Sequence, residues 1–254
     1  GASSTQTNRN VNPMMTSNSI SASAAAAAAA AAKSDSINTP SSLSLEATYI
    51  LQNFSFLVVK EDKKHTLPDG ENPFYSPDET DPLASCGYRY RRFNISSSEK
   101  DPVEIIVRTE IDAYLPGTTS SAPKQTLTIK TLNEFDSKSQ GAGGAPDWRS
   151  KLDSQRGAVV ATEMKNNSFK LARFAVQAIL ANADNMKLGY ISRANSKDAS
   201  KHVILATQSF KPRDFASQMN LNLNNGWGIV RTIVDLVRKK DGKYVLTKDP
   251  NKVS

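Results

Sequence analysis

The sequence has a single cysteine, Cys86, and no long run of apolar residues. One cysteine excludes an internal disulfide framework and fits a reducing compartment, so we expect a cytoplasmic protein. The alanine run at 24–32 is too short and too weakly apolar to cross a membrane as a helix, and no secretory signal is visible. The sequence therefore indicates no membrane partner.

Histidine is also scarce, and neither His65 nor His202 stands at a spacing typical of metal ligands. Charged residues make up 22% of the chain and leave a net charge of +7 at pH 7. A positive balance favours polyanionic partners. A balance of this size is nevertheless common, so it does not by itself indicate RNA binding.

Large apolar side chains are nearly absent from the first 41 residues, which are mainly Ser, Thr, Asn and Ala. Such a segment cannot bury enough surface to offset the entropy that it loses on ordering. We therefore expect residues 1–41 to form a disordered low-complexity segment, with at most a transient helix in the alanine run.

The rest of the chain mixes helical and strand patterns. Apolar residues recur at helical spacing from Leu43 to Phe54, and Thr39 or Ser41 is placed to cap this helix. Alternating segments predict strands at 85–95, 103–115, 125–135, 159–165, 187–193, 201–210 and 243–248, and further helices are predicted at 148–156, 167–182, 212–219 and 226–240. Many of these strands are joined as hairpins. The patterns predict an α/β fold with a mixed or largely antiparallel sheet.

Acidic residues stand at the ends of several expected elements. Glu163 and Lys165 are two apart at the end of an expected strand, so an extended chain would point both to one side. Glu134 and Asp136 have the same spacing, and Glu46 lies on the first helix. Carboxylates held together can bind Mg²⁺, and a lysine beside them can orient a water or a phosphate. Surface strand ends with solvated charges would show the same spacing, and the pattern alone favours that simpler interpretation.

A second candidate site combines aromatic and basic residues in the strand 85–95. Arginines at 89, 91 and 92 are interspersed with aromatic residues at 88, 90 and 93. Aromatic rings can stack on bases, and guanidinium groups can hold phosphates. The alternative is that the rings belong to the core and the arginines form a solvated face. The sequence does not separate these two interpretations.

Several longer motifs together resemble one known family. They are "YRYRRF", "IKTLNEFDS", "DWRSKLDSQRGAVVATEMKNNSFKLARF", "MKLGYISR", "HVILATQSFKP", "FASQMNL" and "YVLTKDPNK", and the likeness runs from about Leu43 to Lys252. The family is the d subunit of eukaryotic translation initiation factor three. Its core is a cap-binding domain, a cup of twisted sheets and helices that is similar to the decapping exoribonucleases.

The resemblance implies a cup-shaped α/β fold with twisted mixed or antiparallel sheets flanked by helices. Residues 42–254 would form the C-terminal part of a cap-binding domain, and residues 1–41 stand in the place of the family's RNA-gate loop. The exoribonucleases hold metals with three acidic motifs, and "SLSLE", "NEFD" and "EMK" stand in the same order here, with Ser42 in place of a motif glycine. This likeness implies Glu46, Asp136 and Glu163 as metal ligands. Mg²⁺ is the candidate ion, and no cofactor is required.

The family holds the capped 5′ end of mRNA for translation and does not cut it, so the resemblance implies a cap-binding module that is not an enzyme. Its partners would be capped mRNA and the other subunits of the initiation factor complex. The expected RNA contacts are Thr48 and Gln52 on the first helix, together with Arg89, Arg91 and Lys165. Two alternatives stay open, namely a metal-dependent RNA 5′-end hydrolase and a non-catalytic scaffold subunit of a large complex.

Overall fold

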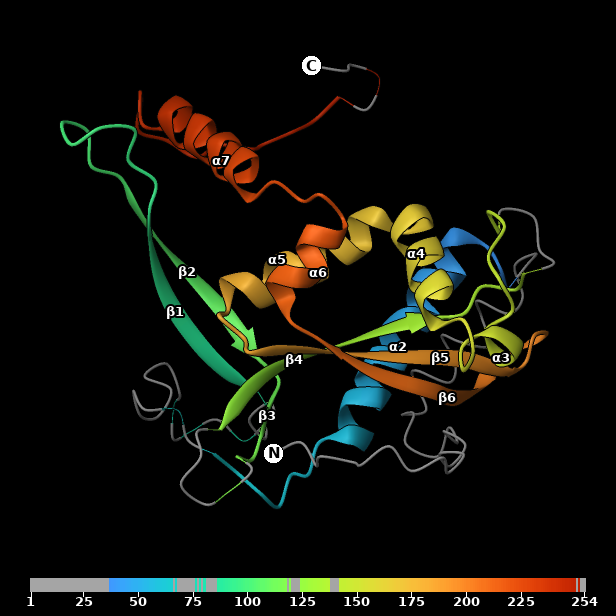
Figure 1. Cartoon of the computed structure of the whole chain (residues 1–254). Coiled ribbons are helices and arrows are strands. Elements are labelled where there is room, and N and C mark those ends of the chain that lie inside the picture. The colour runs from blue at the N-terminus through green and yellow to red at the C-terminus, as the bar shows by residue number, and fades with distance from the viewer. Residues whose placement is uncertain are drawn as a thin grey trace.

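The computed structural model describes residues 37–65, 67, 76, 78, 80, 86–117, 119, 124–137, 142–249 and 251. The helices of this part are α2 (Pro40–Val58), α3 (Trp148–Lys151), α4 (Arg156–Asn166), α5 (Ser168–Leu180), α6 (Pro212–Gln218) and α7 (Leu223–Val237). The strands are β1 (Gly87–Asn94), β2 (Glu104–Ile111), β3 (Ala113–Leu115), β4 (Gln125–Asn133), β5 (Asn185–Asn195) and β6 (Asp198–Phe210) (Figure 1). The expectation of disorder in residues 1–41 falls outside the described residues for positions 1–36. Helix α2 begins at Pro40 and is capped by Thr39, whose hydroxyl accepts a hydrogen bond from the Ser42 amide.

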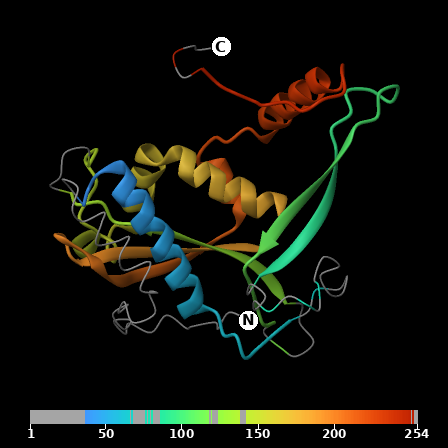
Figure 2. The same cartoon turned by 180° about the vertical axis from the view of Figure 1, so that it is seen from behind.

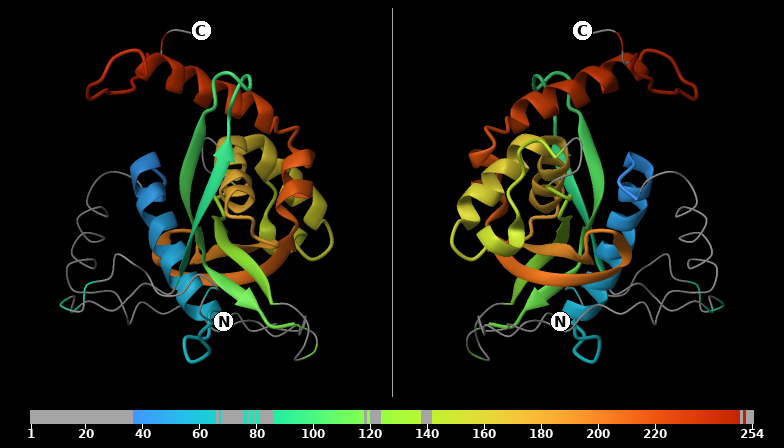
Figure 3. Two further views of the ribbon diagram at one scale, coloured as in Figure 1. Left: turned by 90° about the vertical axis from the view of Figure 1, so that its left-hand side faces the viewer. Right: turned by 90° about the vertical axis from the view of Figure 1, so that its right-hand side faces the viewer.

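The strands form two sheets. β3, β4, β5 and β6 are neighbours in that order in a four-stranded sheet, in which β4 and β5 run parallel and the other pairs run antiparallel. β1 and β2 pair antiparallel as a separate ribbon. The ribbon and the curled four-stranded sheet curve around α4 and α5, and α7 arches over the open side (Figure 3). The predicted α/β fold with twisted mixed sheets and flanking helices is confirmed.

Helices cover both faces of the four-stranded sheet (Figure 2). On one face, Ile50 and Phe54 of α2 pack with Ile191 of β5. On the other face, α4, α5 and α6 pack with Leu188 and Tyr190 of the same strand. Because alternate side chains of a strand point to opposite faces, β5 contributes to both hydrophobic cores.

A glycine in β5 makes room for α2. A Cβ atom at Gly189 would lie 2.6 Å from Cζ of Phe54, and that ring is fully buried. We expect Gly189→Ala to lower the free energy of unfolding by about 1–3 kcal/mol, because the ring must shift within a filled core. Equilibrium unfolding in urea measures this change.

Gly157 on α4 provides the matched control for that substitution, since a Cβ atom there meets nothing within 4 Å. Gly157→Ala should raise the free energy of unfolding by up to about 1 kcal/mol through helix propensity. If Gly189→Ala were as stable as the unchanged protein, this result would contradict the close packing of Phe54 on β5.

One predicted strand divides in two. The pattern predicts a single strand over 103–115, whereas the structure pairs β2 with β1 and β3 with β4. Asp112 separates them, and its Oδ2 accepts a hydrogen bond from the Ile129 amide at 2.6 Å. Burial raises the pKa of Asp112, and this hydrogen bond opposes the rise. The polar residue within the strand pattern thus marks the point where the chain passes from one sheet to the other.

The predicted strand 159–165 is wrong, because this segment lies in helix α4. Val159, Val160 and Glu163 are buried along one side of the helix, whereas Lys165 is exposed. Ala, Met, Glu and Lys are good helix formers and override the short apolar run. Side chains two positions apart on a helix point about 200° apart around its axis, so Glu163 and Lys165 do not point to one side.

The predicted strand 243–248 is also wrong, since no strand is assigned to residues 243–249. Tyr244, Val245 and Leu246 are 53%, 87% and 77% exposed. A strand-forming sequence becomes a strand only when it finds a sheet edge, and this segment pairs with none in the described part of the chain. No described helix combines the length and apolar character needed to cross a membrane.

Candidate functional site

A buried ion-pair cluster joins α2 to the β5–β6 hairpin. Glu46 is 7% exposed and lies one helical turn before Ile50, on the side of α2 that faces the sheet. Its Oε2 lies 2.6 Å from Nη2 of Arg193, and its Oε1 lies 2.9 Å from Nε of Arg193 and 2.6 Å from Nε2 of His202. Arg193 and His202 are direct partners in the β5–β6 register. The antiparallel pairing therefore delivers both basic groups to one carboxylate.

The electrostatics of this cluster favour the ionised acid. Burial alone raises the pKa of Glu46, but hydrogen bonds and charge attraction from Arg193 and His202 lower it from 4.5 to about 2. The Arg193 guanidinium also donates to Asn38 Oδ1 at 2.8 Å and to the Ile37 carbonyl at 2.9 Å. A buried charge of this kind is tolerated when it is paired and its hydrogen bonds are satisfied. The cluster thus fixes the start of α2 against the sheet.

Sequence reasoning missed Arg193 and His202 as partners of Glu46. Both lie in strands that the sequence predicts correctly, and Arg193 is a charged residue within an otherwise buried strand. A buried charge needs a partner, and this was the signal available in the sequence. The partner itself lies 147 residues away, so its identity depended on the tertiary structure.

Two other acids lie on the opposite side of the sheet. Oε2 of Glu163 accepts a hydrogen bond from Nδ2 of Asn167 at 2.6 Å, and Oε1 of Glu134 accepts one from the Trp148 amide at 2.6 Å. Burial raises the pKa of both carboxyls, and the negative charge of Glu134 adds to the rise at Glu163. Lys170 attracts the Glu163 carboxylate and opposes the rise, while burial lowers the pKa of Lys170 itself. The structure therefore brings Glu163 near Glu134, whose charge disfavours the Glu163 carboxylate, and near Lys170, whose charge favours it.

The described residues offer no ready-made cation site. They contain no group of three or more His, Cys, Asp or Glu side chains that is placed to hold a metal ion. Both Glu46 oxygens accept hydrogen bonds from protein donors, Asp136 is half-buried, and Lys165 is exposed. In this arrangement the carboxylates of Glu46, Asp136 and Glu163 do not form a ready-made site for a shared cation. Metal binding by these three residues stays a prediction.

Thr48 and Gln52 lie on the exposed side of α2. They are four residues apart, so they share one helix face, and both are exposed. Oγ1 of Thr48 donates to the Ser44 carbonyl at 3.0 Å, as helical threonines often do. The face that carries them is opposite the one that holds Glu46 against the sheet. Both side chains are therefore exposed on this face in the part of the chain that the structure describes.

Arg89 and Arg91 bind the C-terminal end of α5. Nη1 of Arg89 donates to the Ala181 carbonyl at 2.9 Å, and Nη1 of Arg91 donates to the Leu180 carbonyl at 2.7 Å. These are carbonyls that a helix end leaves without an intrahelical donor, and the positive charge also suits the negative end of the helix dipole. The Arg91 guanidinium further lies 5.0 Å from the Phe93 ring centre. In this structure both arginines fasten the β1–β2 ribbon to α5.

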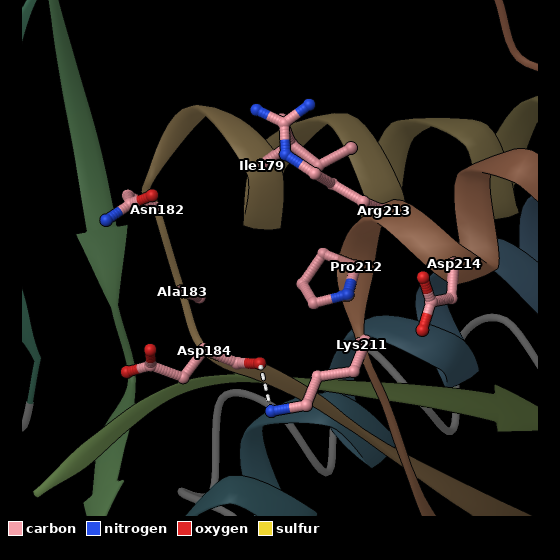
Figure 4. Close-up of a pocket in the computed structure, with 8 residues that line it drawn as sticks. All are labelled: Ile179, Asn182, Ala183, Asp184, Lys211, Pro212, Arg213 and Asp214. Atoms are coloured by element: carbon pink, nitrogen blue, oxygen red, sulfur yellow. Dashed lines mark hydrogen bonds between the residues drawn. The ribbon is translucent and has the colours of Figure 1, made fainter.

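A small cavity opens beside this contact, between the end of α5 and the start of α6 (Figure 4). Its volume is about 310 Å³, and it is lined by Ile179, Asn182, Ala183, Asp184, Lys211, Pro212, Arg213 and Asp214. Nζ of Lys211 donates to the Asp184 carbonyl at 3.4 Å. The two basic and two acidic lining residues balance, so the cavity shows no preference for a charged ligand.

The comparison with known proteins defines the class of this chain. Residues 9–254 match the family described as eukaryotic translation initiation factor 3 subunit 7, so the chain belongs to this family of initiation-factor subunits. It is similar to proteins named as the D subunit of eukaryotic translation initiation factor 3, with 70% identity over 220 residues in Mycosarcoma maydis, 62% over 221 in Sclerotinia sclerotiorum and 58% over 221 in Pyricularia oryzae. These names describe components of a translation initiation factor and not an enzyme.

Each of these alignments covers 86% of the chain and 38% of the relative. The chain therefore spans about two fifths of the length of the curated relatives it matches. The family resemblance that the sequence motifs predict is confirmed.

Proposed function

We propose that this chain is part of a cap-binding module of translation initiation factor 3, which holds the capped 5′ end of mRNA in the cytoplasm together with the other subunits. Membership of the subunit 7 family carries the proposal. The names of the relatives mention neither mRNA nor the cap. The finer function therefore rests on the motif resemblance, and the positive net charge of +7 is compatible with it.

The exposed face of α2 supports a role in RNA contact. Thr48 and Gln52 are both exposed there, and the side chains on the opposite side of the helix fix it to the sheet. A rigid helix presents such groups with little loss of conformational entropy on binding. A hydroxyl and an amide can each donate to a phosphate or accept from a ribose hydroxyl.

A binding experiment tests the proposal on the full-length protein. We expect capped RNA to bind more tightly than the same RNA with a 5′ triphosphate, with both RNAs recovered intact in Mg²⁺. Equal binding of the two RNAs would contradict cap recognition. If the unchanged protein shortened the RNA in Mg²⁺ and the Glu163→Gln variant left it intact, the result would instead indicate a hydrolase.

Thr48→Ala gives the local test of the α2 face. We expect it to weaken binding of capped RNA by about twofold to tenfold, the effect of losing one net hydrogen bond. Thr232→Ala on α7 is the matched control, because Oγ1 of Thr232 makes the same kind of bond, to the Gly228 carbonyl at 2.9 Å, and is also exposed. Equal loss in both variants would contradict a contact at Thr48.

A further inference from the structure

The outer face of the β1–β2 ribbon is an exposed surface that carries aromatic and basic side chains. Alternation along β1 sends Arg89, Arg91 and Phe93 toward the body of the protein and Tyr88, Tyr90 and Arg92 outward. Tyr88 is 37% exposed, Tyr90 is 51% exposed, and the Arg92 side chain is 72% exposed. Figure 1 shows the ribbon extending from the four-stranded sheet toward α7.

The partner strand completes this surface with a second basic group. Arg108 of β2 is the register partner of Tyr90, and its Cζ lies 4.9 Å from the centre of the Tyr88 ring. Ile106, 72% exposed, lies opposite Arg92. We call the surface formed by Tyr88, Tyr90, Arg92, Ile106 and Arg108 the outer ribbon patch.

The chemistry of the outer ribbon patch matches single-stranded RNA. Two tyrosines two residues apart on one strand present their rings on the same face, about 7 Å apart along the strand. Aromatic residues on exposed sheet faces stack on unpaired bases, and neighbouring arginines hold the phosphates between them. This face also carries two acids near the ends of the ribbon pairing: Glu104 is 3.7 Å from Arg92, and Glu110 is the register partner of Tyr88. The centre of the patch therefore carries only aromatic, apolar and positively charged groups.

The inner face of the ribbon holds the patch in place. Arg89 and Arg91 bind the end of α5, and Arg231 of α7 donates to the Ile95 carbonyl at 3.1 Å just beyond β1. Phe93 also packs on Trp227 of α7, with ring centres 5.0 Å apart. These contacts fix the strand that carries both tyrosines, so little ordering cost remains for binding.

We infer that the outer ribbon patch binds single-stranded RNA through base stacking on Tyr88 and Tyr90 and phosphate contacts from Arg92 and Arg108. This site needs no cap. The inference therefore goes beyond the proposed function, and it places the body of the RNA, rather than its 5′ end, on the ribbon.

The test uses the full-length protein and an uncapped oligouridine of about 12 nucleotides with a 5′ hydroxyl, a length that spans one stacking platform. We expect Tyr90→Ala to weaken binding at least about fivefold, the loss of one stacked base, and Tyr90→Phe to change it less than about twofold. Arg108→Gln should reduce the slope of log affinity against log salt by about 0.7, the value for one lost phosphate contact on a single strand.

Tyr244→Ala is the control, because Tyr244 has a matching exposure of 53% and belongs to the segment after α7, outside both strands of the ribbon. An unchanged thermal midpoint shows that each variant is folded. The inference is overturned if folded Tyr90→Ala binds oligouridine as tightly as the unchanged protein does. It is also overturned if Tyr90→Ala loses another subunit of the initiation factor while RNA affinity is unchanged, since the patch is then a protein surface. The two proposals can fail separately. If Tyr90→Ala loses oligouridine binding and the unchanged protein binds capped and uncapped RNA equally, this inference is supported and cap recognition is rejected.

Discussion

Glu46→Gln is expected to lower the free energy of unfolding at pH 7 by about 3–5 kcal/mol, the usual cost of removing one partner of a buried ion pair. The amide would leave the Arg193 charge uncompensated inside the protein, where Arg193 and His202 are 6% and 8% exposed. Its NH₂ group would also face guanidinium or imidazole nitrogens where the carboxylate now accepts hydrogen bonds. Urea unfolding at pH 7 measures the loss.

The control for Glu46→Gln is Glu104→Gln, because Glu104 pairs with Arg92 at 3.7 Å on the surface. Exposed pairs contribute about 0–1 kcal/mol, so this variant should differ little from the unchanged protein. If both variants lost the same stability, the loss would not come from burial of the ion pair.

The same cluster makes the free energy of unfolding depend on pH, and the pKa of Glu46 gives the sign of this dependence. The pKa of Glu46 is about 2 in the folded chain against 4.5 as the reference, so its contribution is fully present above about pH 4.5 and is lost as the pH falls toward 2. A shift of this size corresponds to about 3 kcal/mol. Burial raises the pKa of Glu134 and Glu163, which gives the opposite slope. The contribution of Glu46 is therefore measured as the difference between the unchanged protein and Glu46→Gln at pH 7 and at pH 3. A constant difference would contradict the lowered pKa.

The second large loss of stability is expected when Phe54 is truncated. This side chain is fully buried between α2 and β5, where it fills the space above Gly189. Phe54→Ala should lower the free energy of unfolding by about 3–5 kcal/mol, because it removes buried apolar surface and leaves a cavity that the sheet cannot close. Urea or thermal unfolding of the isolated chain gives the value.

Phe56 lies on the same helix and is 69% exposed, so Phe56→Ala is a matched control for Phe54. Both substitutions change helix propensity equally, and the control should stay within about 0.5 kcal/mol of the unchanged chain. A loss at Phe56 as large as at Phe54 would mean that α2 packs on the sheet with another face.

The local sequence pattern was sufficient to predict most of the helices and strands. The helical spacing of apolar residues predicts α2, α5 and α7, and alternation predicts β1, β5 and β6. These elements have strong periodicity, and their buried faces follow from it. The segment 159–165 is too short for its apolar run to separate a strand from a buried helix, and the segment 243–248 lacks a sheet edge.

By itself, the sequence determined the fold class, the family and the alternation that separates the two faces of β1. These properties depend on periodicity and on motifs that are local in the chain. Only the tertiary structure decided that Glu46 meets Arg193 and His202, that Arg89 and Arg91 bind the end of α5, and that Tyr88 and Tyr90 face outward. Each of these outcomes depends on which distant segment packs against a face, and a charge or a ring has the same local pattern whether its partner is a carboxylate, a helix end or solvent.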